Sequence, residues 1–94
     1  MNKRQLVAAA ARRTPLTQRQ VRLALEATLE TIAEALEAGN SVVIADFGRF
    51  DVQQYPGRRL RRFGAAGHYE VEARIVPVFK SSAALRRRLR EKEE

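Results

Sequence analysis

Cysteine is absent from this 94-residue chain, which excludes disulfide bonds, thiol catalysis and zinc sites with cysteine ligands. The single histidine, His68, has no acidic cluster beside it at metal-ligand spacing, so we predict a surface histidine and no metal site. No apolar run approaches the roughly 20 residues that cross a bilayer, and the alanine-rich stretch 8–11 is too short for a secretory signal. We therefore expect a soluble cytoplasmic protein with no membrane partner.

The sequence also lacks a glycine-rich phosphate loop and a nucleophile motif. Glu70 and Glu72 alternate along an expected strand, and solvated strand charges explain them better than a catalytic pair of carboxylates. We therefore predict that the protein is not an enzyme, with no catalytic residues, no cofactor and no small-molecule substrate.

Positive charge, in contrast, is abundant: the net charge is +7 and the isoelectric point is about 11.0. Residues 1–50 carry seven Lys/Arg and five Asp/Glu, whereas residues 51–94 carry eleven and six. A chain of this length has room for one domain. So basic a balance in so short a chain favours a polyanionic partner, and the second half is expected to hold the binding surface.

The first half of the chain is typical of two antiparallel helices, expected at about 3–13 and 18–38. Each begins with Asn or Thr followed three residues later by Gln, which is the spacing of a capping box. Pro15 disfavours helical geometry just before it, and Gly39 is a helix-stopping residue. The second helix has the clearest periodic apolar stripe in the sequence, formed by Val21, Leu25, Leu29, Ile32 and Leu36.

The pattern then changes to that of extended chain. Residues 41–45 are β-branched and apolar, 46–49 offer a turn, and 50–52 resume the extension. Residues 69–79 alternate and then close in an apolar run, before Ser81 or Ser82 begins a basic helix at about 83–91. We therefore predict an α+β fold with an N-terminal helical hairpin, a three-stranded antiparallel sheet and a short C-terminal helix.

Segment 58–62 holds four arginines in five residues, with extended chain on both sides. Arginine suits phosphate recognition and narrow minor grooves. We predict a protruding two-stranded arm at about 53–70 with its tip near 63–67; the alternative is a solvated, disordered loop. Phe63, close to the tip, is either an apolar wedge that enters between base pairs or a ring that folds back onto Leu60 or a neighbouring strand.

With these residues in view, the sequence resembles the HU/IHF family of bacterial histone-like DNA-binding proteins over essentially its whole length. Two motifs carry the resemblance: Phe-Gly-x-Phe at 47–50 and Val-Pro-x-Phe-Lys at 76–80. The 25 residues between Phe50 and Val76 match an HU-type arm of ordinary length. The resemblance implies an intertwined, obligate dimer whose two arms reach around DNA and place an apolar residue in the minor groove at each of two kinks.

The sequence departs from the family pattern at four places. The arm tip of the family usually has Arg-Asn-Pro followed shortly by Thr-Gly, whereas this chain has Arg61-Arg62-Phe63 and Ala66. Pro56-Gly57 stands at the arm base in place of ordinary strand residues, and Ser81-Ser82 replaces a Pro-Gly pair before the last helix. Phe63 therefore matches the family wedge in position and character but not in identity.

We predict one HU/IHF-like domain spanning 1–94, with a helical dimerisation part at 1–40, a sheet with its arm at 41–80, and a C-terminal helix and tail at 81–94. The apolar stripe and three aromatic side chains supply more apolar surface than one thin sheet can cover, which favours a two-fold dimer. The predicted dimer core contains Leu25, Leu29, Ile32, Leu36, Phe47, Phe50 and Phe79. The predicted DNA-binding residues are Lys3, Arg58, Arg59, Arg61, Arg62, Phe63, Arg74, Lys80 and Arg86.

The predicted function is architectural: nucleoid-associated binding and bending of double-stranded DNA with little sequence specificity, because the minor groove separates little beyond A·T from G·C. Two alternatives stay open. One is an RNA-binding module, although the few aromatic residues offer no stacking platform. The other is an HU-fold interaction protein with weak or lost DNA bending. A homodimer is expected, with a heterodimer containing an unlike HU-type subunit as its alternative.

Overall fold

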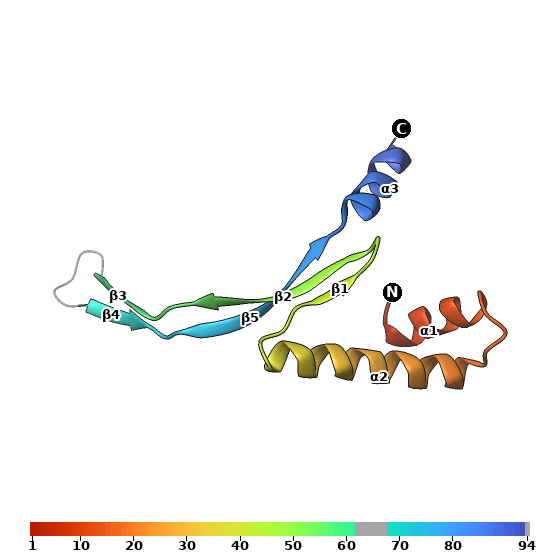
Figure 1. Ribbon diagram of the computed structural model, residues 1–94, viewed down its shortest axis with the longest axis horizontal. Helices are drawn as coiled ribbons and strands as arrows, with labels where there is room; N and C mark the ends of the chain where they lie inside the picture. The colour runs from red at the N-terminus through yellow and green to blue at the C-terminus, as the bar shows by residue number, and fades with distance from the viewer. Residues whose placement is uncertain (62–67, 94) are drawn as a thin grey trace. The chain divides into compact units, whose positions relative to one another are not determined.

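The computed structural model describes residues 1–61 and 68–93, and it describes the side chains of residues 1–57 and 72–92. These residues form two compact units, Met1–Ala35 and Leu36–Glu94. Together they contain three helices and a three-stranded antiparallel sheet, as the sequence predicts (Figure 1).

The first unit contains helix α1 (Lys3–Ala11) and most of helix α2 (Gln18–Glu37). Both predicted capping boxes are present. The Gln5 N–H donates to Asn2 Oδ1 and the Asn2 N–H donates to Gln5 Oε1, each at 2.9 Å. Thr17 and Gln20 make the same reciprocal pair at 2.9 and 3.1 Å. Each box supplies partners for backbone N–H groups that the first helical turn leaves free.

Helix α1 ends at Ala11, two residues before the predicted end. The backbone N–H groups of Arg13 and Thr14 donate three residues back, to Ala10 at 3.0 Å and Ala11 at 3.1 Å. Such tight bonds close the last turn before Pro15, whose ring disfavours helical geometry at Thr14.

Helix α2 ends one residue earlier than predicted, at Glu37. Gly39 follows in the left-handed region at φ +82° and donates its N–H to the Leu36 carbonyl at 2.9 Å. Glycine adopts this conformation without the steric cost that a Cβ atom adds, so Gly39 is the stop signal that the sequence indicated.

The three-stranded sheet has the order β1–β2–β5, with β1 at Val42–Ile44, β2 at Gly48–Tyr55 and β5 at Arg74–Ser81. The predicted turn at 46–49 lies one residue too late, since the turn occupies 45–47 and both Gly48 and Arg49 pair within β2. Asp46 takes the left-handed conformation at φ 62°, which Asp tolerates better than most residues.

The two-stranded pairing predicted for the arm is present in the described backbone, between β3 (Arg58–Arg61) and β4 (His68–Val71). Residues 56–57 and 72–73 separate this ladder from that of β2 and β5, so the continuous strand predicted over 69–79 is interrupted (Figure 1). Proline cannot donate to a ladder, which explains a break at Pro56. Two residues are inserted on each strand, so the β3–β4 ladder continues the register of the β2–β5 ladder. The predicted tip, including Arg62 and Phe63, lies outside the described residues.

Helix α3 spans Ala83–Glu93 and extends two residues past its predicted end. Of the two serines that could begin it, Ser82 is the cap: its Oγ accepts from the Leu85 N–H at 3.0 Å. The Ser82 N–H donates to the Phe47 carbonyl at 2.9 Å, which ties the start of α3 to the turn between β1 and β2.

The apolar residues predicted as dimer core are poorly covered within a single chain. Among the described side chains, the buried apolar residues are Val7 and Ala11, both on α1. Phe79 contacts Phe50 with ring centroids 5.1 Å apart, and it lies 5.6 Å from Phe47. Phe47 and Phe79 nevertheless remain 46% and 45% exposed. The other predicted core residues are half-buried or exposed as well: Leu25, Leu29, Ile32, Leu36 and Phe50.

Gly48 provides a test of how closely β2 approaches β5. A Cβ atom at this position would lie 2.6 Å from the Lys80 carbonyl oxygen and 2.6 Å from the Phe79 ring. Gly48→Ala should therefore lower the free energy of unfolding by about 1–3 kcal/mol, measured by denaturant unfolding at fixed chain concentration. Gly39→Asn is the control: its Cβ meets nothing within 4 Å and Asn tolerates a positive φ, so its effect should be smaller. Equal stability of wild type and Gly48→Ala would contradict the close approach.

Candidate nucleic-acid interface

Strands β2 and β5 place three basic residues on one face of the sheet. Arg49 is the direct cross-strand partner of Lys80, and Tyr55 is the partner of Arg74. Side chains alternate between faces along a strand and cross-strand partners share a face. Arg49, Arg74 and Lys80 therefore share one face, which we call the cationic face. Phe50 and Phe79, also cross-strand partners, lie on the opposite face.

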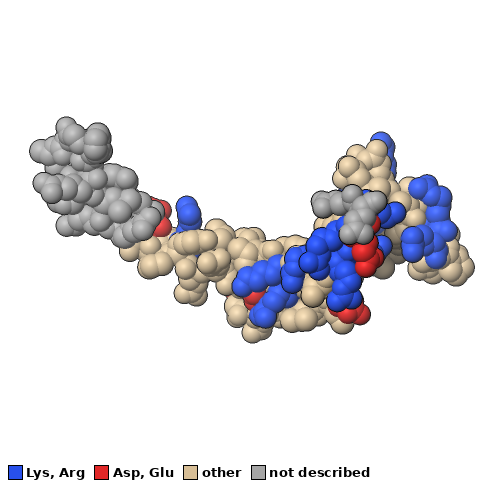
Figure 2. Space-filling view, turned by 90° about the horizontal axis from the view of Figure 1, so that it is seen from above, with Lys and Arg blue, Asp and Glu red and all other residues tan. Residues whose placement is uncertain are grey.

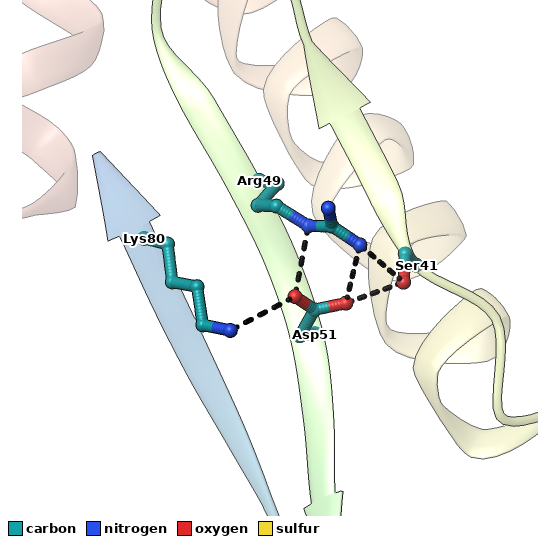
Figure 3. Close-up of polar contacts among 4 residues, drawn as sticks. All are labelled: Ser41, Arg49, Asp51 and Lys80. Carbon is teal, nitrogen blue, oxygen red and sulfur yellow. Dashed lines mark hydrogen bonds and ion pairs between the residues drawn. The ribbon is translucent and has the colours of Figure 1, made fainter. Parts of the chain in front are cut away.

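Asp51 holds two of these cations (Figure 3). Its Oδ2 lies 2.8 Å from Arg49 Nε and 3.7 Å from Lys80 Nζ, and its Oδ1 accepts from Arg49 Nη2 at 3.1 Å. The Ser41 hydroxyl donates to Asp51 Oδ1 and accepts from Arg49 Nη2 at 3.2 Å. The hydrogen bond from Ser41 lowers the pKa of the Asp51 carboxyl, and the hydrogen bond and charge of Arg49 lower it further.

Arg74 lies over an aromatic ring at the root of the arm. Its guanidinium carbon is 4.9 Å from the centroid of the Tyr55 ring, within the range of a cation–π contact. This pair is the last of the β2–β5 ladder before the interruption at Pro56. A guanidinium stacked in this way keeps its planar N–H edges available for an anion.

Helix α3 adds a second group of cations. Arg86 donates from Nη1 to the Ser81 backbone carbonyl and, at 3.3 Å, to Ser81 Oγ, which fixes its side chain at the junction of β5 and α3. Three further arginines on this helix are exposed: Arg87, Arg88 and Arg90. In the view of Figure 2, the blue surface of lysine and arginine is more extensive than the red surface of acidic residues.

The predicted DNA-binding residues fall into several groups. Arg74 and Lys80 share the cationic face, and Arg86 lies just beyond the end of β5. Arg58, Arg59 and Arg61 are on β3, where the structure describes only the backbone. Lys3 belongs to the other unit, where its ammonium lies 3.5 Å from the Glu26 carboxylate. Arg62 and Phe63 lie outside the described residues.

Sequence reasoning missed Arg49 because the turn was assigned to 46–49. The signal was present in the pattern: a turn one residue earlier places Arg49 inside the strand, directly beside Phe50 of the Phe-Gly-x-Phe motif. Tyr55 was not singled out within the predicted arm at 53–70, because its contact with Arg74 depends on a cross-strand register that the sequence alone does not reveal.

Other kinds of site find little support. No group of three or more His, Cys, Asp or Glu side chains that could hold a metal ion occurs in the part of the chain that the structure describes. None of the helices within residues 1–61 and 68–93 combines the length and the apolar character needed to cross a membrane.

The chain matches known proteins along nearly its whole length. The family model described as bacterial DNA-binding protein matches residues 1–90. DNA-binding protein HU of Clostridium pasteurianum is 36% identical over 81 residues, covering 86% of this chain and 89% of the relative. DNA-binding protein HU-alpha of Serratia marcescens is 37% identical over 86 residues, covering 92% and 96%.

Solved structures give the same answer for the fold. The Anabaena HU–DNA cocrystal structure superposes with a TM-score of 0.82 at 34% identity and covers 95% of this chain and 97% of that one. HU from Thermotoga maritima has a TM-score of 0.69 at 31% identity, covering 95% and 98%. The match is to a DNA-binding family rather than to an enzyme family, which confirms the prediction that the protein is not an enzyme. The chain therefore belongs to the bacterial DNA-binding protein family to which the HU proteins belong.

Proposed function

We propose that this protein binds and bends double-stranded DNA as a homodimer, with little sequence specificity, as a nucleoid-associated protein of the bacterial cytoplasm. The observation that carries the proposal is the cationic face, where Arg49, Arg74 and Lys80 share one side of the sheet. The family supports it, since the relatives are named as DNA-binding HU proteins and the Anabaena neighbour is an HU–DNA cocrystal.

The phosphate ligands on the body are Arg74, Lys80 and Arg86, with Lys3 supplied by the helical unit. Arginine matches the geometry of a phosphate with two parallel N–H donors, while lysine contributes a point charge. Contacts of this kind orient a duplex and raise affinity without reading bases. The binding free energy is therefore expected to be mainly electrostatic and dependent on salt.

The arm supplies the remaining contacts in this proposal. Arg58, Arg59, Arg61 and Arg62 follow the minor groove, and Phe63 enters a base-pair step as a wedge. The minor groove carries a degenerate pattern of donors and acceptors, so binding should favour flexible or pre-bent duplexes over particular sequences.

Exposed apolar surface supports the homodimer. Phe47 and Phe79 are each nearly half exposed in one chain, and Leu29 on α2 is 48% exposed. A second copy related by two-fold symmetry would cover such surfaces, because the same patch on each chain faces its partner across the axis. In this arrangement 1–94 acts as one domain, in which 1–40 dimerises, 41–80 forms the sheet with its arm, and 81–94 adds the final helix.

The dimer can be tested by the concentration dependence of unfolding. If the folded state contains two chains, the melting temperature should rise with chain concentration. Phe79→Ala should lower the free energy of unfolding by roughly 3–5 kcal/mol, as for a large buried aromatic side chain. Val43→Ala is the control, since Val43 lies on the cationic face of the sheet and is 70% exposed. A melting temperature independent of concentration, with a small effect of Phe79→Ala, would rule out the dimer.

Duplex binding can be tested by its salt dependence, measured by fluorescence anisotropy on linear duplex DNA and on structured RNA. The slope of log K against log salt should be steep, at about −0.9 for each phosphate contact. Neutralising Arg58 and Arg61 to Gln should flatten the slope by about two to four units, since each dimer loses four arginines. Arg19→Gln with Arg22→Gln, on α2, removes the same net charge and should leave the slope close to wild type. Tighter binding of RNA than of DNA would favour the RNA-binding alternative.

Phe63 can be tested by separating bending from binding. A wedge stabilises an unstacked step, so Phe63→Ala should lose bending in an energy-transfer assay while keeping the fold and most of the salt dependence. Phe63→Pro, which restores the residue usual in the HU/IHF family, should retain much of the bending. A ring that folds back onto Leu60 predicts the reverse, with lower stability and an unchanged bend. Full bending by Phe63→Ala would show that the arginines alone deform the groove.

A further inference from the structure

The cationic face contains one acidic residue within strands β1, β2 and β5, and this residue contacts two of the three cations of that face. Asp51 is two residues along β2 from Arg49, so both point to the same side of the sheet. Lys80 reaches Asp51 from the neighbouring strand β5 (Figure 3). The pair of cations and the carboxylate together carry a net charge of +1, whereas the two cations alone would carry +2.

A carboxylate and a phosphate are competing ligands for these cations. Asp51 binds Arg49 through two atoms, Nε at 2.8 Å and Nη2 at 3.1 Å, and this is one of the forked edges by which arginine also binds phosphate. The same carboxylate is 3.7 Å from the Lys80 ammonium. A DNA phosphate that takes this edge of Arg49 must therefore displace Asp51, and a phosphate that binds Lys80 must compete with the nearby charge of Asp51.

We propose that Asp51 is an intramolecular competitor of the DNA phosphates, which holds Arg49 and Lys80 while no duplex is bound and so lowers the affinity of the cationic face. The inference rests on the proposed function. In this proposal Asp51 lowers DNA affinity, whereas the other charged side chains of the cationic face raise it.

Asp51 is much less exposed than the two cations that it binds, as expected if the carboxylate stays in place while the cations move. The Asp51 side chain is only 16% exposed, whereas Arg49 and Lys80 are 48% and 66% exposed. The Ser41 hydroxyl donates to Asp51, so the carboxylate keeps a partner when the cations leave it. The two cations are exposed, and ion pairs of exposed side chains are weak in water, so several phosphates arriving together on a duplex can replace the carboxylate.

Protonation does not relieve this competition at ordinary pH. Hydrogen bonds from Ser41 and Arg49 lower the pKa of Asp51, so the group is ionised throughout neutral and mildly acidic conditions. The affinity should consequently show no step from Asp51 between about pH 5 and 8. A substitution is the way to remove the charge.

The test compares Asp51→Asn with wild type by anisotropy on one linear duplex at several salt concentrations. The variant should bind about three- to tenfold more tightly at low salt, and the log–log slope should steepen by about 0.9 or more as each freed cation gains a phosphate. Asp51→Thr gives a second neutral variant with better strand propensity in case Asn is poorly tolerated. Asp51→Glu, which keeps the charge, should bind like wild type.

Two controls locate the effect. Glu37→Gln removes one negative charge from the end of α2 and should change the affinity much less than Asp51→Asn. In a background that already carries Arg49→Gln and Lys80→Gln, Asp51→Asn should give no gain, because no cation remains to be released. A gain that persists there would mean a general field effect and would overturn the proposal. Equal or weaker binding by Asp51→Asn, alongside wild-type protein that binds duplex, would overturn it as well. Wild-type protein without duplex affinity would instead refute the proposed function.

Discussion

The antiparallel pairing of β2 with β5 is the constraint on which the other features depend. Its register places Phe50 opposite Phe79 on one face and Arg49 opposite Lys80 on the other. A slip of β5 by one residue would reverse its side chains relative to β2, which would place Phe79 on the side of Arg49 and Lys80 on the side of Phe50. The close contact of Gly48 with the Lys80 carbonyl and the Phe79 ring opposes such a slip, because another residue at this point would not fit.

The two faces have different roles in this account. The aromatic face is only half covered in one chain, which supports the proposed association with a second copy. Asp51 neutralises part of the positive charge of the cationic face, because it pairs with Arg49 and Lys80. Stability and DNA affinity are thus set by different side chains of the same two strands, and substitutions on one face should leave the property of the other face largely unchanged.

Much of this fold could be predicted because its signals are local. The capping boxes at Asn2 and Thr17 and the stop at Gly39 each follow from neighbours within four residues. The C-terminal end of α1 and the turn before Gly48 were wrong by one or two residues, since tight bonds near Pro15 and the conformation of Asp46 decide them. Asp51 could not be recognised as a partner of Lys80, because the two residues are 29 positions apart in the sequence and lie on different strands.

The most direct test of the division between the two faces is an NMR titration with a short duplex that follows side-chain signals. The account predicts that the Arg49 and Arg74 guanidinium signals and the Lys80 ammonium signal shift together as duplex is added. The ring signals of Phe50 and Phe79 should stay near their free positions over the same range. Shifts of the rings with unchanged signals from the three cations would contradict the assignment of the DNA-binding surface to the cationic face.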